Sequence, residues 1–513
     1  MDGNTLTLLT IVEPLWWLAF FAATGLCLGS FLNAVIYRLP RNISINNPRW
    51  SFCPSCGTRL RWYDNLPLVS YLRLKGRCRD CDAPISPRYP LGETLGAILA
   101  ILVFDALVIA QTHSGLATGA LGISWRLSQD WPIVLAHLIL FACLFGMAAI
   151  DLENYWVDIR FTTVATVSGF VLHALWTPAS SDTWLRPGPT AAAVTVAMTI
   201  TVLLSLWVIR HLLPHDDYAR DPDASAHAVA RLAPRVVHAM QFDVSVAEIQ
   251  ETDHNAAPPP AQPRWLMMGV TTVAGAVLVG LIAGALAASR RPDPSVVPLR
   301  WLPALLLLFC LIVYELSRTR EADTHIHDAI EEEAPSARRF AAIELVTLLP
   351  TAVVGAAVLI WMRQDADVHA AVAGWLRWHP VGDWRPLLGL STAATGFIVG
   401  GAIGWLVRIP ATLILGKEAF GTGDIHILAA AGCVAGWPVA MIGFILCSFL
   451  ALAGWIIAIP LKRSRIIALV PWLAMGMLLV TLYFDPIINS QAVRNVTYVY
   501  DALVRHAPAG SVH

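Results

Sequence analysis

Long apolar runs recur along most of this 513-residue chain and limit what it can fold into. A run of about 20 apolar residues is long enough to cross a bilayer as a helix. Only 14% of the residues are charged, whereas a soluble domain carries about 25%. We therefore expect an all-α, polytopic transmembrane bundle of about 11–12 spans. The long runs lie at 14–37, 91–110, 131–150, 159–177, 189–213, 265–288, 298–316, 340–362, 386–409, 437–459 and 465–484, and a shorter one at 425–436 predicts a half-length or tilted helix.

The loop 38–90 sets the orientation of the chain. It holds ten lysines and arginines against three aspartates, so the positive-inside rule places it in the cytoplasm. The first run lacks a basic leader and a cleavage site, and we expect it to be a retained span. Counting spans from the loop returns the connections 151–158, 214–264, 317–339, 410–424 and 460–464 to the cytoplasm. The basic stretch 461–465 agrees, and 289–293 disagrees mildly.

Four of the nine cysteines form two C-x-x-C pairs in this loop, Cys53 with Cys56 and Cys78 with Cys81. Four thiolates satisfy tetrahedral zinc, and the 21 residues between the pairs lie just beyond the usual zinc-ribbon spacing. Because no coordination position is left open, we predict a structural zinc in a small zinc-ribbon-like domain. The alternative is a set of reduced or redox-active thiols without metal.

Two aspartates stand where apolar runs meet the predicted cytoplasmic face. Asp151 ends the run 131–150, and Asp424 follows Gly421 and Gly423 in GTGDIHILAAAG. An aspartate at a helix start is commonly a cap, so capping explains each residue taken alone. Asp158 lies seven residues after Asp151, on the same side if the helix continues.

Carboxylates within membrane spans are usually functional. Two of them brought together cannot both ionise easily, so the pair shares a proton. One then serves as the base that activates water, and the other as the acid that polarises a scissile carbonyl. Glycines beside Asp424 let a substrate backbone approach. The alternative is that these aspartates are interfacial caps and solvated helix ends.

Several stretches together resemble the type IV prepilin leader peptidases, which are membrane aspartyl proteases that also N-methylate the new terminus. The resemblance covers about 300 residues, and the cysteine domain combined with a G-x-G-D motif is specific to that family. The stretches are GSFLNAVIYRLP (29–40), the whole cysteine domain with DNLPLVSYL and ISPRYPLGE (53–99), GMAAIDLENYWVD (146–158), GKEAFGTGDIHILAAAGCVAGW (416–437) and LVPWLAMG (469–476).

The resemblance implies roles for individual residues. Asp151 and Asp424 match the catalytic pair, and the four cysteines match the zinc ligands. Asp158 matches a second acidic position and is a secondary candidate, together with Gly421, Gly423 and His426. The methyl donor would be S-adenosylmethionine, for which no binding motif is visible.

The resemblance also implies the substrates, the partners and the location of the protein. The substrates would be prepilin or pseudopilin precursors, and components of pilus or secretion assembly are further candidate partners. The protein would lie in the bacterial inner membrane, in contact with the lipid bilayer, with its active site facing the cytoplasm. No nucleic-acid partner is expected.

Three departures from the family pattern stand out. Val157 replaces a proline, and His426 replaces a lysine. Because histidine titrates near neutrality, we expect activity with an altered pH profile. The third departure is length, because Asp151 and Asp424 are 273 residues apart and the family is far shorter. The excess carries four apolar runs, an even number, so Asp424 returns to the same face as Asp151.

These considerations divide the chain into six parts. They are a first span (1–37), a cytoplasmic cysteine domain (38–90), a membrane core with the first aspartate (91–184), an insertion with about four spans and a polar loop (185–365), a core with G-x-G-D (366–484) and a polar tail (485–513).

The insertion is either a partner-docking module or an expanded spacer. The main alternative function is a catalytically altered homologue that acts as a membrane scaffold. A transporter with paired carboxylates is a third hypothesis, but it gives no reason for the zinc ribbon.

Overall fold

The computed structural model describes residues 3–491, 493 and 495, except 42, 114, 118–121, 177, 179–187, 213–263, 291–296, 317–321, 376–385 and 459–466. The described residues contain no strand, only two isolated bridges in the cysteine domain. The elements are α1 (Gly3–Arg38), η1 (Leu39–Arg41), η2 (Trp62–Asp64), α2 (Val69–Arg73), α3 (Arg88–Phe104), η3 (Asp105–Ile109), α4 (Ile123–Asn154), α5 (Ile159–Leu175), α6 (Pro189–Leu212), α9 (Arg264–Arg290), α10 (Val297–Leu316), α11 (Ala322–Gln364), α12 (Ala366–Trp375), α13 (Pro386–Leu415), α14 (Thr422–Ala435), α15 (Trp437–Ala458), α16 (Val470–Leu482) and α17 (Phe484–Ile488).

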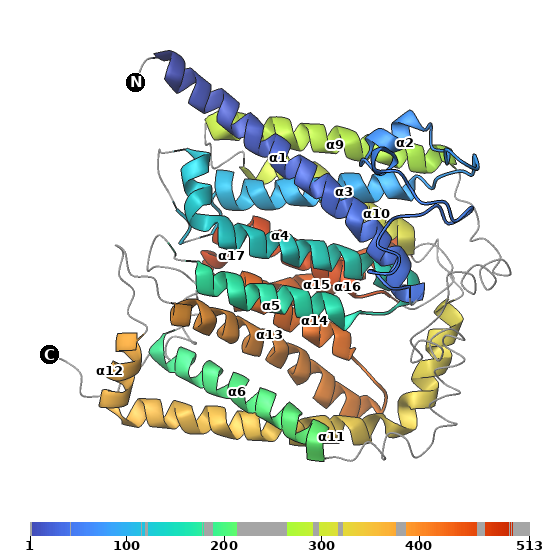
Figure 1. Ribbon diagram of the computed structural model, residues 1–513. Coiled ribbons are helices and arrows are strands. Elements are labelled where there is room, and N and C mark those ends of the chain that lie inside the picture. Colours follow the sequence, from blue (N-terminus) through green and yellow to red (C-terminus); the bar gives the residue numbers. More distant parts are fainter. Residues whose placement is uncertain are drawn as a thin grey trace.

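Every apolar run of the sequence forms a helix, and these helices lie side by side in one bundle (Figure 1). Among the described residues, eight helices are long and apolar enough to cross a membrane, and α5, α14, α16 and the segment Pro189–Val202 of α6 are shorter apolar stretches. The prediction of an all-α polytopic membrane protein is confirmed. At 14 residues, α14 is about 21 Å long and shorter than a bilayer core, as the run 425–436 predicts.

The largest difference from the predicted spans is helix α11. The sequence predicts a span at 340–362 preceded by a polar connection at 317–339, but the 43-residue helix already begins at Ala322. The sequence favours a partly disordered connection with some helix there, and the structure is helical from Ala322 onward. The stretch EEEAPSARRF consists mostly of good helix formers, which an apolar pattern does not detect. The predicted polar loop 214–264 lies outside the described residues apart from Arg264, as do the basic stretch 461–465 and most of the tail.

Glycine stripes bring two pairs of helices into close backbone contact. The G-x-x-x-G segments 25–29 of α1 and 92–96 of α3 face each other, and a Cβ added at Gly25 would lie 2.5 Å from the Gly96 carbonyl oxygen. The stripe 396–404 of α13 packs on α14 in the same way, because a Cβ at Gly396 would lie 1.8 Å from a backbone oxygen of α14. Small residues permit such approaches in membrane helices. This packing fixes the depth of α14, which carries Asp424.

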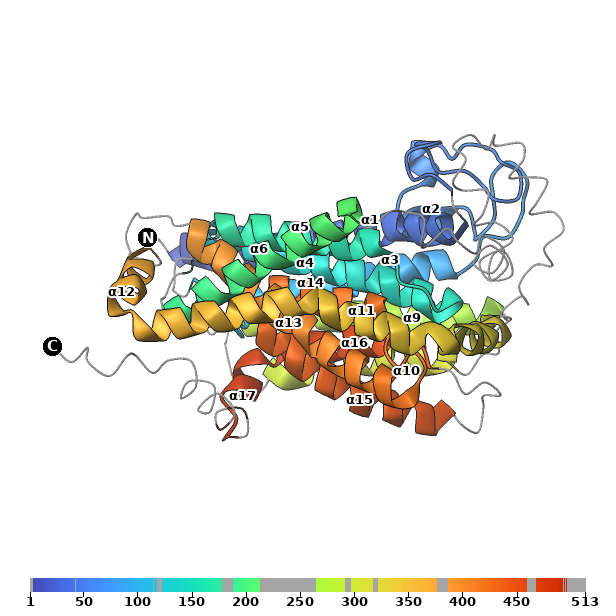
Figure 2. The same ribbon diagram turned by 90° about the horizontal axis from the view of Figure 1, so that it is seen from below.

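The cysteine domain stands at one end of the bundle (Figure 2), which we call the cysteine-domain end. Arg38, the last residue of α1, donates hydrogen bonds of 2.8–3.1 Å to four backbone carbonyls between residues 44 and 50. Asn33 of α1 donates to the Tyr89 carbonyl at 2.9 Å, and Glu93 of α3 accepts the Leu68 amide at 2.8 Å. These bonds attach the domain to the first two spans.

Four helices of the predicted insertion lie on two flanks of the bundle. Helices α9 and α10 contact α3 and α15, respectively, while α6 and α11 pack against α13 on the opposite flank (Figure 1). On the first flank, buried Asp105 accepts hydrogen bonds from Arg300 at 2.6 and 2.7 Å and from Trp301 at 2.7 Å, both on α10. On the second, Thr195 of α6 bonds Thr395 of α13 at 2.9 Å. The four described helices of the insertion therefore pack directly on the core.

Candidate active site and metal centre

The four motif cysteines converge into one cluster. Their Sγ atoms all lie within 4.8 Å of one another, and the Cys53 and Cys81 sulfurs are 3.9 Å apart. All four are free thiols. Sulfur ligands at ~2.3 Å from a tetrahedral zinc stand about 3.8 Å from one another. The cluster therefore fits a metal ion such as zinc.

The two C-x-x-C segments adopt the same backbone turn. The amide of the first cysteine donates to the carbonyl five residues on, at 3.0 Å in one pair and 2.8 Å in the other. Gly57 and Asp82, each directly after its second cysteine, both have left-handed φ values, 70° and 54°. In the first pair, the hydrogen bond between Cys56 and the Thr58 hydroxyl lowers the pKa of Cys56 to about 6. The pKa of Cys81, beside the other sulfurs, is raised to about 12, and burial raises that of Cys53. A metal ion bound by all four sulfurs would therefore have to displace protons.

Asp64 organises the segment between the two cysteine pairs. Its side chain is only 5% exposed and accepts hydrogen bonds from Arg79 at 2.6 and 2.9 Å and from Arg73 at 2.9 Å. Both guanidinium groups also lie over the Tyr63 ring. The bonds from Arg79, and then those from Arg73, hold the pKa of Asp64 below its ordinary value. Two of the loop's basic residues are therefore structural partners of a buried carboxylate.

Asp151 is buried in the last turn of α4, with 6% of its surface exposed. Its Oδ2 accepts the amide of Val470, the first residue of α16, at 3.0 Å. The free amides and the dipole of a helix N-terminus favour a carboxylate at that place. An ion pair between Arg88 of α3 and Glu153 of α4 ties this part of α4 to the cysteine-domain end.

Asp158 does not share a helix face with Asp151, because α4 ends at Asn154. Tyr155 adopts a left-handed φ of 52°, and a new helix begins after Asp158. The Asp158 carboxylate accepts the Arg160 amide at 2.8 Å and pairs with its guanidinium at 2.6 Å. Asp158 thus caps α5, and a further role for it stays a prediction.

Asp424 is the third residue of α14, and Gly421 is the N-cap. The carboxylate is half-buried and lies against the backbone of Gly421. A Cβ at Gly421 would lie 3.1 Å from Asp424 Oδ2, so glycine leaves room for that carboxylate. Asp424 therefore occupies the position used by the acidic member of a capping box.

Gly423 brings the two aspartate-bearing segments into direct contact. A Cβ there would lie 2.7 Å from the Cβ of Val157, which follows the end of α4 and precedes Asp158. Helix α14 also packs against α4 and α5. Asp151 and Asp424 therefore lie at the same end of the bundle. The expectation that these glycines admit a substrate backbone does not hold for Gly423, because Val157 fills that space. His426 is exposed on α14.

Arg408 of α13 is a site residue that the sequence analysis does not identify. It is 7% exposed and donates hydrogen bonds to the Glu418 carboxylate and the Phe420 carbonyl, just before G-x-G-D. It also forms a bidentate pair with Glu344 of α11, at 3.0–3.2 Å. The sequence offers one signal for this residue, a lone arginine near the end of the apolar run 386–409. A charge in such a run usually has a partner.

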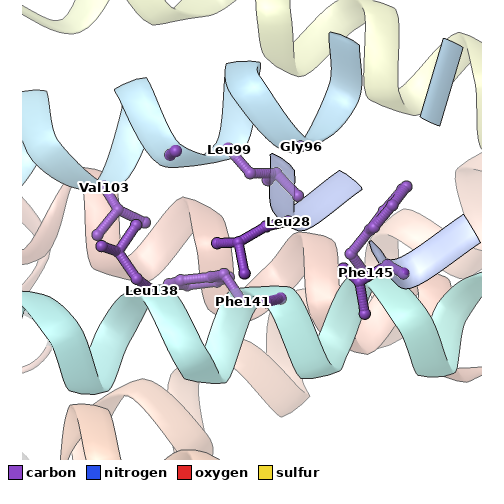
Figure 3. A pocket seen from close by; sticks show the side chains of 10 residues that line it. Leu28, Gly96, Leu99, Val103, Leu138, Phe141 and Phe145 are labelled. Atoms are coloured by element: carbon purple, nitrogen blue, oxygen red, sulfur yellow. The ribbon is translucent and has the colours of Figure 1, made fainter. Parts of the chain in front are cut away.

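The pocket in Figure 3 lies among α1, α3 and α4 and offers no chemistry for catalysis. Its lining contains no acid, base or metal ligand. The lining residues are Leu28, Leu32, Gly96, Leu99, Ala100, Val103, Leu138, Phe141, Ala142 and Phe145.

Comparison with known proteins agrees with these motifs. Residues 23–107 match the family model of the bacterial peptidase A24 N-terminal domain. A prepilin leader peptidase/N-methyltransferase of Myxococcus xanthus is 39% identical over 153 residues, 30% of this chain and 39% of that protein. One from Vibrio cholerae is 37% identical over 145 residues, 27% of this chain and 49% of that protein. The match therefore spans less than half of these two relatives. No solved structure matches the chain significantly.

A third relative is matched over most of its length. The prepilin leader peptidase/N-methyltransferase of Klebsiella pneumoniae is 35% identical over 204 residues, which are 38% of this chain and 74% of that protein. Together with the cysteine cluster and the two aspartate segments, this extent of similarity shows that the chain belongs to the prepilin leader peptidase/N-methyltransferase family.

Proposed function

We propose that this protein is a membrane aspartyl endopeptidase that removes the leader of type IV prepilin or pseudopilin precursors and then N-methylates the new terminus. The names of its relatives support both activities. The observation that carries the proposal is the contact between Gly423 and Val157. It joins the two aspartate-bearing segments at one end of the bundle, as a two-carboxylate site requires.

Asp151 and Asp424 would divide the work of hydrolysis. One carboxylate, in its ionised form, takes a proton from water as the water oxygen bonds to the scissile carbonyl carbon. The other, protonated, donates to the carbonyl oxygen. The C–N bond then breaks as the first carboxyl group gives its proton to the leaving amine, and the second carboxylate takes back a proton from a hydroxyl of the tetrahedral intermediate. The amide of Val470 donates to Asp151, and the backbone of Gly421 lies against Asp424, so both carboxylates are held in orientation.

The cysteine-domain end would face the cytoplasm of a bacterial inner membrane, because the loop 38–90 is strongly basic. A precursor anchored by its own apolar helix would then present its leader at the depth of the two aspartates. Components of pilus or secretion assembly stay predicted partners, for which no residue is assigned.

The cysteine cluster would hold a structural zinc ion, with Cys53, Cys56, Cys78 and Cys81 as its four ligands. S-adenosylmethionine would supply the methyl group that the new α-amino group accepts. No residue of this chain is assigned to binding it, so the second activity is supported by family membership alone.

Cleavage of a pilin-like precursor by purified protein tests the proposal. Mass spectrometry reads the new N-terminus with S-adenosylmethionine present, for wild type, Asp151→Ala and Asp424→Ala. Asp367→Ala, an exposed acid in the first turn of α12, is the matched control. We expect wild type and control to cut and to add one methyl group, and both site variants to be inactive. Equal cutting by the site variants would favour the scaffold alternative.

A further inference from the structure

The insertion contributes to the geometry of the candidate active site. We infer that Arg408, held by Glu344 of the insertion helix α11, is a positioning residue that fixes the peptide group beside the Asp424 carboxylate. The inference rests on the proposed role of Asp424. It assigns a task to the insertion beyond those of a spacer or a docking module.

The central observation concerns one peptide group. The carbonyl oxygen of Phe420 and the amide hydrogen of Gly421 belong to the same planar unit, and they point in opposite directions. Arg408 donates to that oxygen, and the Asp424 carboxylate lies against Gly421, since a Cβ added there would stand 3.1 Å from Asp424 Oδ2. Fixing the carbonyl end therefore fixes the direction in which the amide points beside Asp424. A cation on the carbonyl also polarises the amide and makes it a stronger donor.

Two carboxylates hold Arg408 in place. Glu344 accepts its Nε at 3.0 and 3.2 Å and its Nη2 at 3.0 Å, and Glu418 accepts Nη1. The Arg408 side chain is 9% exposed, compared with 20% for Glu344 and 35% for Glu418. A buried guanidinium needs such partners, and a bidentate carboxylate fixes the plane of its fork. Glu344 therefore determines how Arg408 presents Nη1 to the loop.

Helix α11 also holds the beginning of the same loop. Arg338 donates to the carbonyls of Leu413 and Ile414 at 3.1 and 3.4 Å, in the last turn of α13. These carbonyls have no partner within their own helix. Directly after them, Gly416 turns the chain with a φ of 71°. The segment 416–421 is thus held at its start by Arg338 and at its end by Arg408 with Glu344.

Three variants test the inference: Arg408→Gln, Glu344→Gln and the double variant. Thr347→Val, on the same helix as Glu344, is the matched control. Two readouts are needed, the kcat and KM of precursor cleavage and the hydrogen exchange of backbone amides in residues 416–424. The second readout does not depend on catalysis.

We expect Arg408→Gln to lower kcat on the order of tenfold or more with little change in KM, because a charge-assisted hydrogen bond is lost in the site. Glu344→Gln should act in the same direction and more weakly. Since Glu344 acts through Arg408, the double variant should match Arg408→Gln alone. Amides of 416–424 should exchange faster in all three variants and be unchanged in the control.

Three outcomes would overturn the inference. The effects of the two substitutions on kcat could add independently, the effect could be confined to KM, or the hydrogen exchange of residues 416–424 could be unchanged. If Arg408→Gln does not fold, Glu344→Gln decides the matter, because a wild-type kcat and wild-type exchange in that variant would refute the coupling. Failure of the proposed function would appear differently, as absence of cleavage by wild type, while the exchange result would still test the positioning contact.

Discussion

Replacing Gly423 with alanine should disable the site by pushing its two halves apart. The added Cβ would lie 2.7 Å from the Cβ of Val157, where ordinary contacts are 3.4–4 Å. The two segments must then separate by at least about 0.7 Å. Misplacement of reacting groups by about 1 Å costs on the order of 100-fold in rate. Because alanine forms helices better than glycine does, loss of helix α14 would not account for such a fall.

The assay is precursor cleavage, with two companion variants. Val157→Gly in the Gly423→Ala background removes the opposing Cβ. We expect the double variant to cleave at least tenfold faster than Gly423→Ala alone. Gly401→Ala is the control, because its Cβ would meet only a Cβ of Ala429, at an ordinary 3.6 Å. Activity of Gly423→Ala within about twofold of wild type, or no recovery in the double variant, would refute the reasoning.

Three further predictions concern stability and metal. The pKa of Asp64 is lowered by Arg79 and Arg73, so the stability that its ionised form contributes is present above its unfolded pKa, about 4, and is lost as the pH falls below that value. Thermal unfolding between pH 6 and 3 should show this loss in wild type, and an equal loss in Asp64→Asn would contradict it. Asp105→Asn leaves the buried Arg300 without its counter-charge and should cost about 3 kcal/mol; an unchanged unfolding temperature would argue against the ion pair. Cys78→Ser removes one of four converging sulfurs, and metal analysis should show a loss of bound zinc, whereas full retention would rule out a four-cysteine site.

The membrane helices could be predicted from the sequence, because the length of an apolar run is a local property. The start of helix α11 is the exception. Its first turns are polar, so the length of the apolar run does not locate the residue at which the helix begins. The even number of spans in the insertion predicted that Asp424 would return to the side of Asp151. It could not predict that α9 and α10 would lie on one flank and α6 and α11 on the other, since that depends on tertiary packing.

The motifs identified Asp151, Asp424 and the cysteines, because each has a characteristic spacing. They did not reveal the contacts that organise the site. Asp158 follows a helix break at Tyr155, whose backbone is left-handed. No feature of the sequence indicates that conformation. Arg408 pairs with Glu344, 64 residues away, and the sequence contains many other charged residues that could be its partner. Such pairings become visible only when the helices are placed in space.

Parallel cleavage assays of Asp151→Asn, Asp424→Asn and Asp158→Asn would show whether the first two residues are the catalytic pair. Each variant replaces a carboxylate with an amide of the same shape, so neighbouring backbone amides keep an acceptor. We expect the first two variants to fold but not to cut, because neither amide can serve as acid or base. We expect Asp158→Asn to cut, because that residue caps α5. Cleavage by the Asp151 or Asp424 variant would contradict the assignment, and inactivity confined to the Asp158 variant would transfer the catalytic role to that residue.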